Sequence, residues 1–112
     1  MSIYLPGGGD DDTTVVEVNI GYYNFPNPFN PRSNWTNIRY DLKETKQVAI
    51  DIYDDRENLV INLIDGEIRE PGEHLEEWNG RDQDGDIVQN GVYYAILLIG
   101  TKMYVVQMSV IQ

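Results

Sequence analysis

Apolar and polar side chains alternate along two segments of the chain, residues 38–42 and 48–53. Because successive side chains of a β-strand point to opposite faces, this alternation predicts two strands that are each buried on one face. The positions that we expect to face the core are Ile38, Tyr40, Leu42, Val48, Ile50 and Ile52. No segment shows the sustained 3.6-residue period of an amphipathic helix, so helices are not expected.

Further segments have the composition or the spacing of β-strands. They are residues 13–20, 59–64, 73–78, 92–99 and 102–111. Turn-forming residues separate these segments at short intervals, as in the E-P-G run at residues 70–72. About seven short strands with such turns predict an all-β fold, an antiparallel β-sandwich.

The run at residues 92–99 is apolar at nearly every position, which is typical of a central strand that is covered on both sides. The residues that we expect on the inner face of this strand are Val92, Tyr94, Ile96 and Leu98. In the last segment alternation returns, and the side chains that share its apolar face are Tyr104, Val106, Met108 and Val110.

Glycine, aspartate and proline interrupt the first third of the chain. Residues 1–12 contain three consecutive glycines and three consecutive aspartates, which predicts a flexible tail or linker. Residues 13–112 are then expected to form one domain, a length that can bury a modest core. Residues 21–33 contain three prolines, and because proline cannot donate to a strand ladder, we expect a rigid extended connection there.

Composition changes the picture mainly through charge. Eight lysines and arginines stand against nineteen aspartates and glutamates, a formal net charge of −11. This balance argues against nucleic acid, which requires a basic surface, and against an anionic membrane surface. Cysteine is absent, which excludes disulfides, zinc–thiolate sites and cysteine chemistry. No apolar run is long enough to span a bilayer, and residues 1–12 lack the basic and apolar regions of a signal peptide.

Several motifs follow one another in the order found in a known family. Residues 24–31 read N-F-P-N-P-F-N-P and lead into W-T-N-I-R-Y at residues 35–40. W-N-G follows at residues 78–80 and N-G-V-Y-Y at residues 90–94. Together they resemble a bacterial C-terminal immunoglobulin-like module that is related to the flagellar hook-capping protein and to the type IX secretion sorting domain. The resemblance covers residues 24–112.

The resemblance implies an immunoglobulin-like β-sandwich fused to a passenger protein that is secreted or held at the cell surface. It implies a non-catalytic role in export or sorting, surface attachment or spacing, with the passenger or the secretion and surface machinery as protein partners. We expect no cofactor, and the absence of a long apolar run predicts no insertion into a membrane. The positions that carry the motifs, and to which we assign a structural role, are Asn24, Pro26, Asn27, Pro28, Phe29, Asn30, Pro31, Trp78, Gly80, Gly91, Val92 and Tyr93.

An acidic turn is the first candidate for chemistry. Asp82, Asp84 and Asp86 surround Gly85, and carboxylate oxygens are ligands that calcium prefers. An EF-hand loop, however, has glycine at its sixth position and aspartate at its first, and Gly80 stands where that aspartate would be. We therefore favour an acidic hairpin turn over a calcium site, and we expect no metal.

The single histidine, His74, excludes a two-histidine metal site within one chain. It shares a strand face with Trp78, so packing or a hydrogen bond at the rim of the core is expected. Glu76 and Glu77 point to opposite faces of the same strand and make a poor acid–base pair. No serine lies in a G-x-S-x-G or S-x-x-K setting, and we expect no catalytic residue.

Aromatic residues are the last candidates. Two tryptophans and eight tyrosines offer enough rings for a platform on which sugars stack, as in many sandwich modules. Packing in the core and between strands is nevertheless the more frequent use of such residues in sheets. Exposure of Tyr22, Tyr23 and Tyr93 is the observation that would separate these two interpretations.

Three hypotheses for function remain open. The first is the non-catalytic surface or export module, and the second is a self-assembling scaffold or filament subunit that exchanges residues 13–20 between copies. The third is a carbohydrate-binding module. Residues 13–20 are too apolar to remain free in water, so we expect them to add a strand to a sheet edge. Their own sandwich is the favoured partner over a neighbour's, because pairing within one chain benefits from a high effective concentration.

Overall fold

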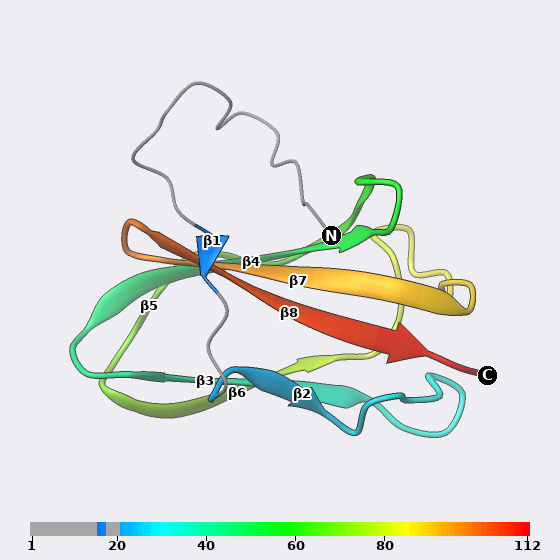
Figure 1. Cartoon of the computed structure of the whole chain (residues 1–112), viewed down its shortest axis with the longest axis horizontal. Helices are drawn as coiled ribbons and strands as arrows, with labels where there is room; N and C mark the ends of the chain where they lie inside the picture. Colours follow the sequence, from blue (N-terminus) through cyan, green and yellow to red (C-terminus); the bar gives the residue numbers. More distant parts are fainter. Residues whose placement is uncertain (1–15, 18–20) are drawn as a thin grey trace.

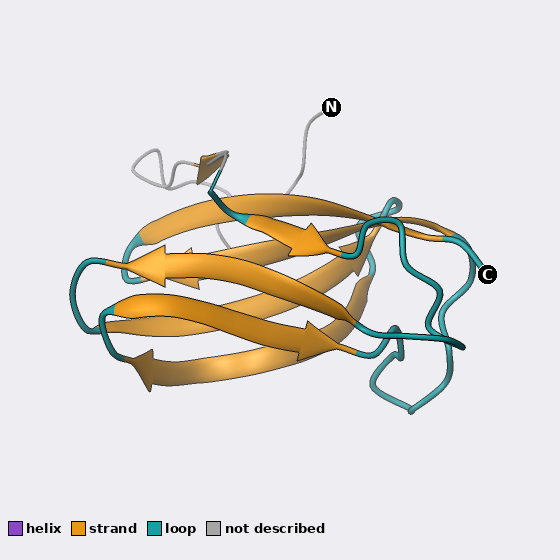
Figure 2. Cartoon of the chain, turned by 90° about the horizontal axis from the view of Figure 1, so that it is seen from below, coloured by secondary structure: helices purple, strands orange, loops and turns teal. Residues whose placement is uncertain are grey.

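Two β-sheets lie face to face in the computed structural model, which describes residues 16–17 and 21–112 (Figure 1). The strands are β1 (Val16–Glu17), β2 (Tyr23–Phe25), β3 (Thr36–Leu42), β4 (Lys46–Asp54), β5 (Leu59–Arg69), β6 (Gly72–Trp78), β7 (Gly91–Ile99) and β8 (Lys102–Val110). Strands and loops account for all of the described residues (Figure 2). The predicted all-β sandwich is therefore confirmed. No helix that could cross a bilayer occurs in the described part of the chain.

The larger sheet has five strands in the order β1-β8-β7-β4-β5, and the smaller has three in the order β2-β3-β6. Neighbouring strands are antiparallel, except that β1 runs parallel to β8. A tight turn between β5 and β6 carries the chain from one sheet to the other. β7 lies at the centre of the larger sheet, as its uniformly apolar sequence predicted.

The alternating segments bury the predicted faces. Their apolar residues belong to one core cluster between the sheets: Ile38, Tyr40, Leu42, Val48, Ile50 and Ile52. β8 contributes Val106, Met108 and Val110 to the same cluster, with Tyr104 packed against it. Alternation was informative in these strands because only one of their faces is apolar.

For β7 the predicted inner face is wrong. The side chains that enter the core are Tyr93, Ala95, Leu97 and Ile99, whereas Val92, Tyr94, Ile96 and Leu98 belong to the opposite face of the strand. Pairing with β4 determines which face is which, since Leu97 lies opposite Ile50 and both side chains point into the sandwich. Both faces of β7 are apolar, so the sequence of this strand contains no signal that selects between them.

Two strand boundaries also differ from the prediction. β5 does not end at residue 64 but continues to Arg69 through a bulge, where Asp65 and Gly66 lie opposite Ala49 of β4. Gly66 has a φ of 63°, which glycine adopts without strain. Residues 21–33 are not wholly a connection, because β2 pairs with β3 just before the first proline, where the backbone amides are still available.

Near the N-terminus, Val16 and Glu17 pair with Met103 and Tyr104 of β8 in the same chain. They form the edge of the larger sheet (Figure 1). The remaining residues of the strand predicted at 13–20, and the tail predicted at 1–12, lie outside the described residues.

Candidate functional site

The motif residues meet at one end of the sandwich, in an aromatic cluster built from distant parts of the chain. Phe29 and Trp78 contact each other edge to face with ring centroids 5.5 Å apart, and Trp78 and Tyr93 do so at 5.7 Å. Trp78 is fully buried, and its indole Nε1 donates to the carbonyl oxygen of Arg81 at 3.1 Å. The buried polar atom of the cluster is thus satisfied, as burial requires.

Gly80 brings the proline-rich segment against this cluster. Its φ is 74°, and a Cβ atom placed there would lie 2.5 Å from the Cβ of Pro31 and 3.3 Å from a ring carbon of Phe29. Real Cβ atoms do not approach that closely, so only glycine allows this contact. The last proline of the N-P-F-N-P motif can therefore pack this closely only because the W-N-G motif ends in glycine.

The same proline-rich segment covers the free edge of β8. The side-chain oxygen of Asn27 accepts from the amide of Ser109 at 2.9 Å, and its Nδ2 donates to the carbonyl oxygen of Gln107 at 3.4 Å. Two residues on, the amide of Phe29 donates to the Ser109 oxygen, and the amide of Ile111 donates to the Phe29 oxygen. These bonds replace the missing neighbouring strand, which a sheet edge otherwise seeks from another chain.

The other asparagines of the segment serve its own backbone. Asn24 is buried, and its Nδ2 donates to the hydroxyl of Thr36 at 3.0 Å; that hydroxyl in turn donates to the Pro26 carbonyl at 2.9 Å. Asn30 accepts at its Oδ1 from the amide of Arg32 at 2.9 Å. Side chains thus bond to backbone groups of a segment whose prolines have no N–H to donate.

Pro28 and Gly91 are two further motif residues, and both lie next to residues that pair with the end of β8. Pro28 stands between Asn27 and Phe29, the two residues that bond to β8, and Gly91 begins β7 opposite Val110. Val92, the next residue, faces away from the core and is half-buried.

Tyr93 completes the aromatic cluster. Its hydroxyl donates to the carbonyl oxygen of Gln89 at 2.6 Å. Burial, together with the negative charges of Asp54 and Asp55, raises the pKa of Tyr93 above its usual value. The phenol therefore stays neutral and remains a hydrogen-bond donor.

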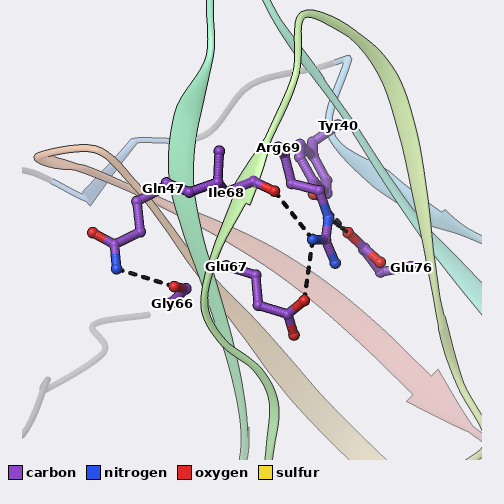
Figure 3. A network of polar contacts seen from close by, with 7 residues as sticks. All are labelled: Tyr40, Gln47, Gly66, Glu67, Ile68, Arg69 and Glu76. Atoms are coloured by element: carbon purple, nitrogen blue, oxygen red, sulfur yellow. Dashed lines mark hydrogen bonds and ion pairs between the residues drawn. The ribbon is translucent and has the colours of Figure 1, made fainter.

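A network of polar side chains connects the two sheets (Figure 3). Glu76 of β6 accepts at one carboxylate oxygen from the hydroxyl of Tyr40 at 2.7 Å and from Nε of Arg69 at 3.0 Å. Burial and the Glu76 carboxylate raise the pKa of Tyr40 above its usual value, so the phenol remains a donor. The acid, the phenol and the guanidinium satisfy one another, which suits a structural connection between β3, β5 and β6.

Sequence reasoning did not identify this network. A signal for it was present, because Glu76 shares the inward face of its strand with His74 and Trp78, and an inward carboxylate requires a partner. The identity of that partner could not be read from the chain, since Arg69 lies in the other sheet. His74 packs its ring against Tyr40 at 5.2 Å, and its Nε2 lies 2.6 Å from the Glu70 carbonyl oxygen.

The acidic turn brings its three aspartates together. One carboxylate oxygen from each of Asp82, Asp84 and Asp86 lies within 4.8 Å of the others. The Oδ1 of Asp82, however, already accepts from the amides of Asp84 and Asp86, both at 3.0 Å. Calcium takes six to eight oxygen ligands, whereas this turn offers one ligand atom from each of three side chains. The hydrogen bonds from the Asp84 and Asp86 amides favour the acidic hairpin turn as the description of this segment.

The three tyrosines singled out from the sequence separate into two groups. Tyr93 is buried in the cluster described above, and Tyr22 packs against Tyr104 at 4.7 Å. Tyr23 is exposed, and so is Trp35, whereas Trp78 is fully buried. Core packing therefore accounts for Tyr93 and Trp78, whereas Tyr23 and Trp35 remain exposed.

Comparisons with known proteins agree with the motifs. No protein-family model matches the sequence, and no curated protein matches it. Among solved structures, the chain is similar to part of PorZ, an essential bacterial surface component of the type IX secretion system of Porphyromonas gingivalis, with a TM-score of 0.57 and 25% identity. It is also similar to FlgD of P. aeruginosa, with a TM-score of 0.54 and 22% identity.

These alignments cover most of this chain but less of the other proteins. The PorZ alignment spans 82% of this chain and 12% of PorZ, and the FlgD alignment spans 74% of this chain and 63% of FlgD. The two proteins represent the type IX secretion system and the flagellar hook cap, the two groups to which the sequence motifs pointed. The resemblance seen in the sequence is confirmed at the level of the fold.

Proposed function

We propose that the chain is a non-catalytic β-sandwich module of a longer secreted or cell-surface bacterial protein, where it serves in export, surface attachment or spacing. The observation that carries this proposal is the likeness to PorZ, in which a fold matching 82% of this chain makes up 12% of a surface protein. So small a share of a surface protein suits a supporting role beside other domains, which is the role proposed for this chain.

The chemistry of the described residues supports a structural role. Glu76 is engaged by Tyr40 and Arg69, and the Asp82 carboxylate is engaged by backbone amides. His74 has Tyr40 and the Glu70 carbonyl as its neighbours, with no nucleophile in that pair of contacts. Activated nucleophiles and general bases need a different arrangement, in which a base is aimed at the reacting group.

A fusion experiment tests the export role. Residues 1–112 are joined to the C-terminus of a fluorescent reporter that carries a signal peptide, in a bacterium that has a type IX secretion system. We expect protease-accessible reporter on the cell surface, and periplasmic reporter in a strain that lacks the system. Retention in the periplasm of both strains would contradict a role in export.

The self-assembly hypothesis has weaker support. Strand exchange through residues 13–20 requires these residues to pair with another copy, whereas Val16 and Glu17 pair with β8 of their own chain. The edge of β8 beyond that point is covered by Asn27 and Phe29. Little of the β8 edge is left for an added strand.

A further inference from the structure

Three aromatic side chains are exposed near one edge of the smaller sheet. Tyr23 and Phe25 lie on β2, and Trp35 comes directly before β3, the strand that pairs with β2. Their exposed fractions are 46%, 42% and 51%. Asn24 between the first two is buried, so alternation turns both of their rings outward. We call Tyr23, Phe25 and Trp35 the aromatic row.

Register arranges the row along the sheet. Tyr23 lies opposite Arg39 and Phe25 lies opposite Asn37, while Trp35 is two residues before Asn37. Two residues of an antiparallel strand advance about 6.8 Å, so the three positions extend over roughly 14 Å. The rings of Tyr23 and Phe25 are adjacent, with centroids 5.9 Å apart. Single exposed aromatic residues are ordinary, but three on the same face of neighbouring segments are a candidate binding surface.

Fixed polar groups stand beside the rings. The guanidinium of Arg39 lies 5.9 Å from the centre of the Tyr23 ring, and it is held by Glu73 at 2.8 Å and by the Gly21 carbonyl at 2.6 Å. The Nδ2 of Asn37 donates to the Phe25 carbonyl at 3.4 Å. Donors and acceptors are therefore in place next to an apolar surface before any ligand arrives, which lowers the entropy lost on binding.

We propose that the aromatic row binds a neutral polysaccharide. A pyranose ring has an apolar face of C–H groups, which packs on an aromatic ring, and a rim of hydroxyl groups that both donate and accept. Asn37 and Arg39 supply donors to those hydroxyls, and the carboxylates of Glu73 and Glu77, across β3 on β6, supply acceptors. A row of three rings suits a chain of several sugars rather than a single sugar.

Charge selects the neutral class. The chain has a net charge of −11, and Asp41, Glu73 and Glu77 lie on the same side of the sheet as Arg39. An anionic glycan would meet these carboxylates, and a second copy docked on the same face would bring like charges together. A ligand without charge avoids both penalties.

Tryptophan fluorescence provides the test, because Trp35 is half exposed and Trp78 is fully buried. Acrylamide quenching of the full chain therefore reports mainly on the aromatic row. The probes are a soluble β-glucan, a xylan and a mannan, with alginate as the anionic comparison. We expect at least one neutral polymer to protect Trp35 from quenching, and alginate to give no protection.

Variants assign the binding to the rings. Tyr23→Ala and Phe25→Ala are each expected to weaken the apparent affinity roughly tenfold, as truncation of an aromatic anchor does. Tyr23→Phe keeps the ring and is expected to bind like the wild type. Leu59→Ala is the matched control, since Leu59 is also 46% exposed but lies at the start of β5 in the other sheet.

The outcomes are distinct from those of the export experiment, because binding is measured on the isolated chain. Protection by none of the neutral polymers would overturn the proposal, and so would alanine variants that bind like the wild type while melting at its temperature. Light scattering adds a third outcome. A change in molar mass caused by Tyr23→Ala or Phe25→Ala would identify the aromatic row as an interface between copies instead.

Discussion

Gly80 is a motif residue at which the structure leaves no room for a side chain. The methyl group of an alanine there would collide with Pro31, and the alanine backbone would have to adopt a φ of 74°. We expect Gly80→Ala to lower the free energy of unfolding by about 2–4 kcal/mol, the sum of overpacking and left-handed backbone strain. Urea denaturation of the two proteins measures the difference.

Gly85 provides the matched control for this prediction. Its φ is 86°, but a Cβ atom placed there meets nothing within 4 Å. Gly85→Ala should therefore show the conformational cost alone, about 1 kcal/mol. Equal losses for the two variants would mean that the contact with Pro31 contributes nothing.

Asp54 gives the molecule a pH dependence. Partial burial opposes its charged form, but hydrogen bonds from the amides of Asn58 and Arg56 outweigh burial and lower the pKa of Asp54. A lowered pKa means that the stabilisation is complete above the unfolded value of about 3.9 and is lost as the pH falls through the folded value. We expect Asp54→Ala to be less stable than the wild type at pH 7 and the difference to shrink below about pH 4. Denaturation at several pH values tests this, and a difference that stays constant down to pH 3 would contradict it.

Among the strands, β7 has neighbouring residues with opposite environments. Leu97 is fully buried in the core, whereas Leu98 is 37% exposed on the other face. We expect Leu97→Ala to cost about 2–5 kcal/mol, because truncation leaves a cavity between the sheets. Leu98→Ala should cost less than about 1 kcal/mol, since its methyl groups are already partly in water. Thermal or urea unfolding measures both losses. A larger loss for Leu98→Ala than for Leu97→Ala would mean that Leu98 lies on the inner face, as the sequence predicted.

The cover of the β8 edge by Asn27 can also be tested. Asn27→Ala removes the acceptor for the Ser109 amide and the donor to the Gln107 carbonyl. The expected loss is about 1–2 kcal/mol, typical of removing one hydrogen-bonding side chain. Amide hydrogen exchange should become faster at Ser109 and remain unchanged at Leu97, which pairs within the sheet. Unchanged exchange at Ser109 would show that the Asn27 side chain does not protect the edge.

How well sequence reasoning worked depended on the element. β3 and β4 were predicted with their correct faces because each has one apolar and one polar face. The inner face of β7 was missed because both faces are apolar, and the bulge in β5 was missed because Asp65-Gly66 has the composition of a turn. These features depend on the partner strand, and a single strand does not contain that information.

The same limit applies to the functional surfaces. The motif residues could be recognised from their order, but their meeting around Gly80 depends on contacts between segments some fifty residues apart, such as Pro31 and Gly80. Tyr23 is exposed, unlike Tyr22, because β2 pairs with β3. β2 itself was not predicted, since three prolines led us to interpret residues 21–33 as a connection. Aromatic composition alone therefore suggested a sugar platform without indicating which rings are exposed.

At the scale of the whole molecule, the fold is that of a self-contained module. Among the residues whose burial the structure describes, the hydrophobic core extends from Phe29 to Val110. The C-terminal part of β8 is covered by Asn27 and Phe29 of the same chain. These properties suit the proposed module, because the β8 edge offers little free backbone to another copy.

Removal of residues 1–20 tests this view of the molecule. β1 adds only two paired residues to the edge of β8. We therefore expect residues 21–112 to fold, to remain monomeric and to melt within a few degrees of the full chain. The full chain should also be monomeric, because Val16 and Glu17 find their partners within it. Light scattering over a range of concentrations measures both proteins. An oligomeric full chain beside a monomeric shorter one would show that this segment pairs between copies, and the self-assembly hypothesis would then replace the module.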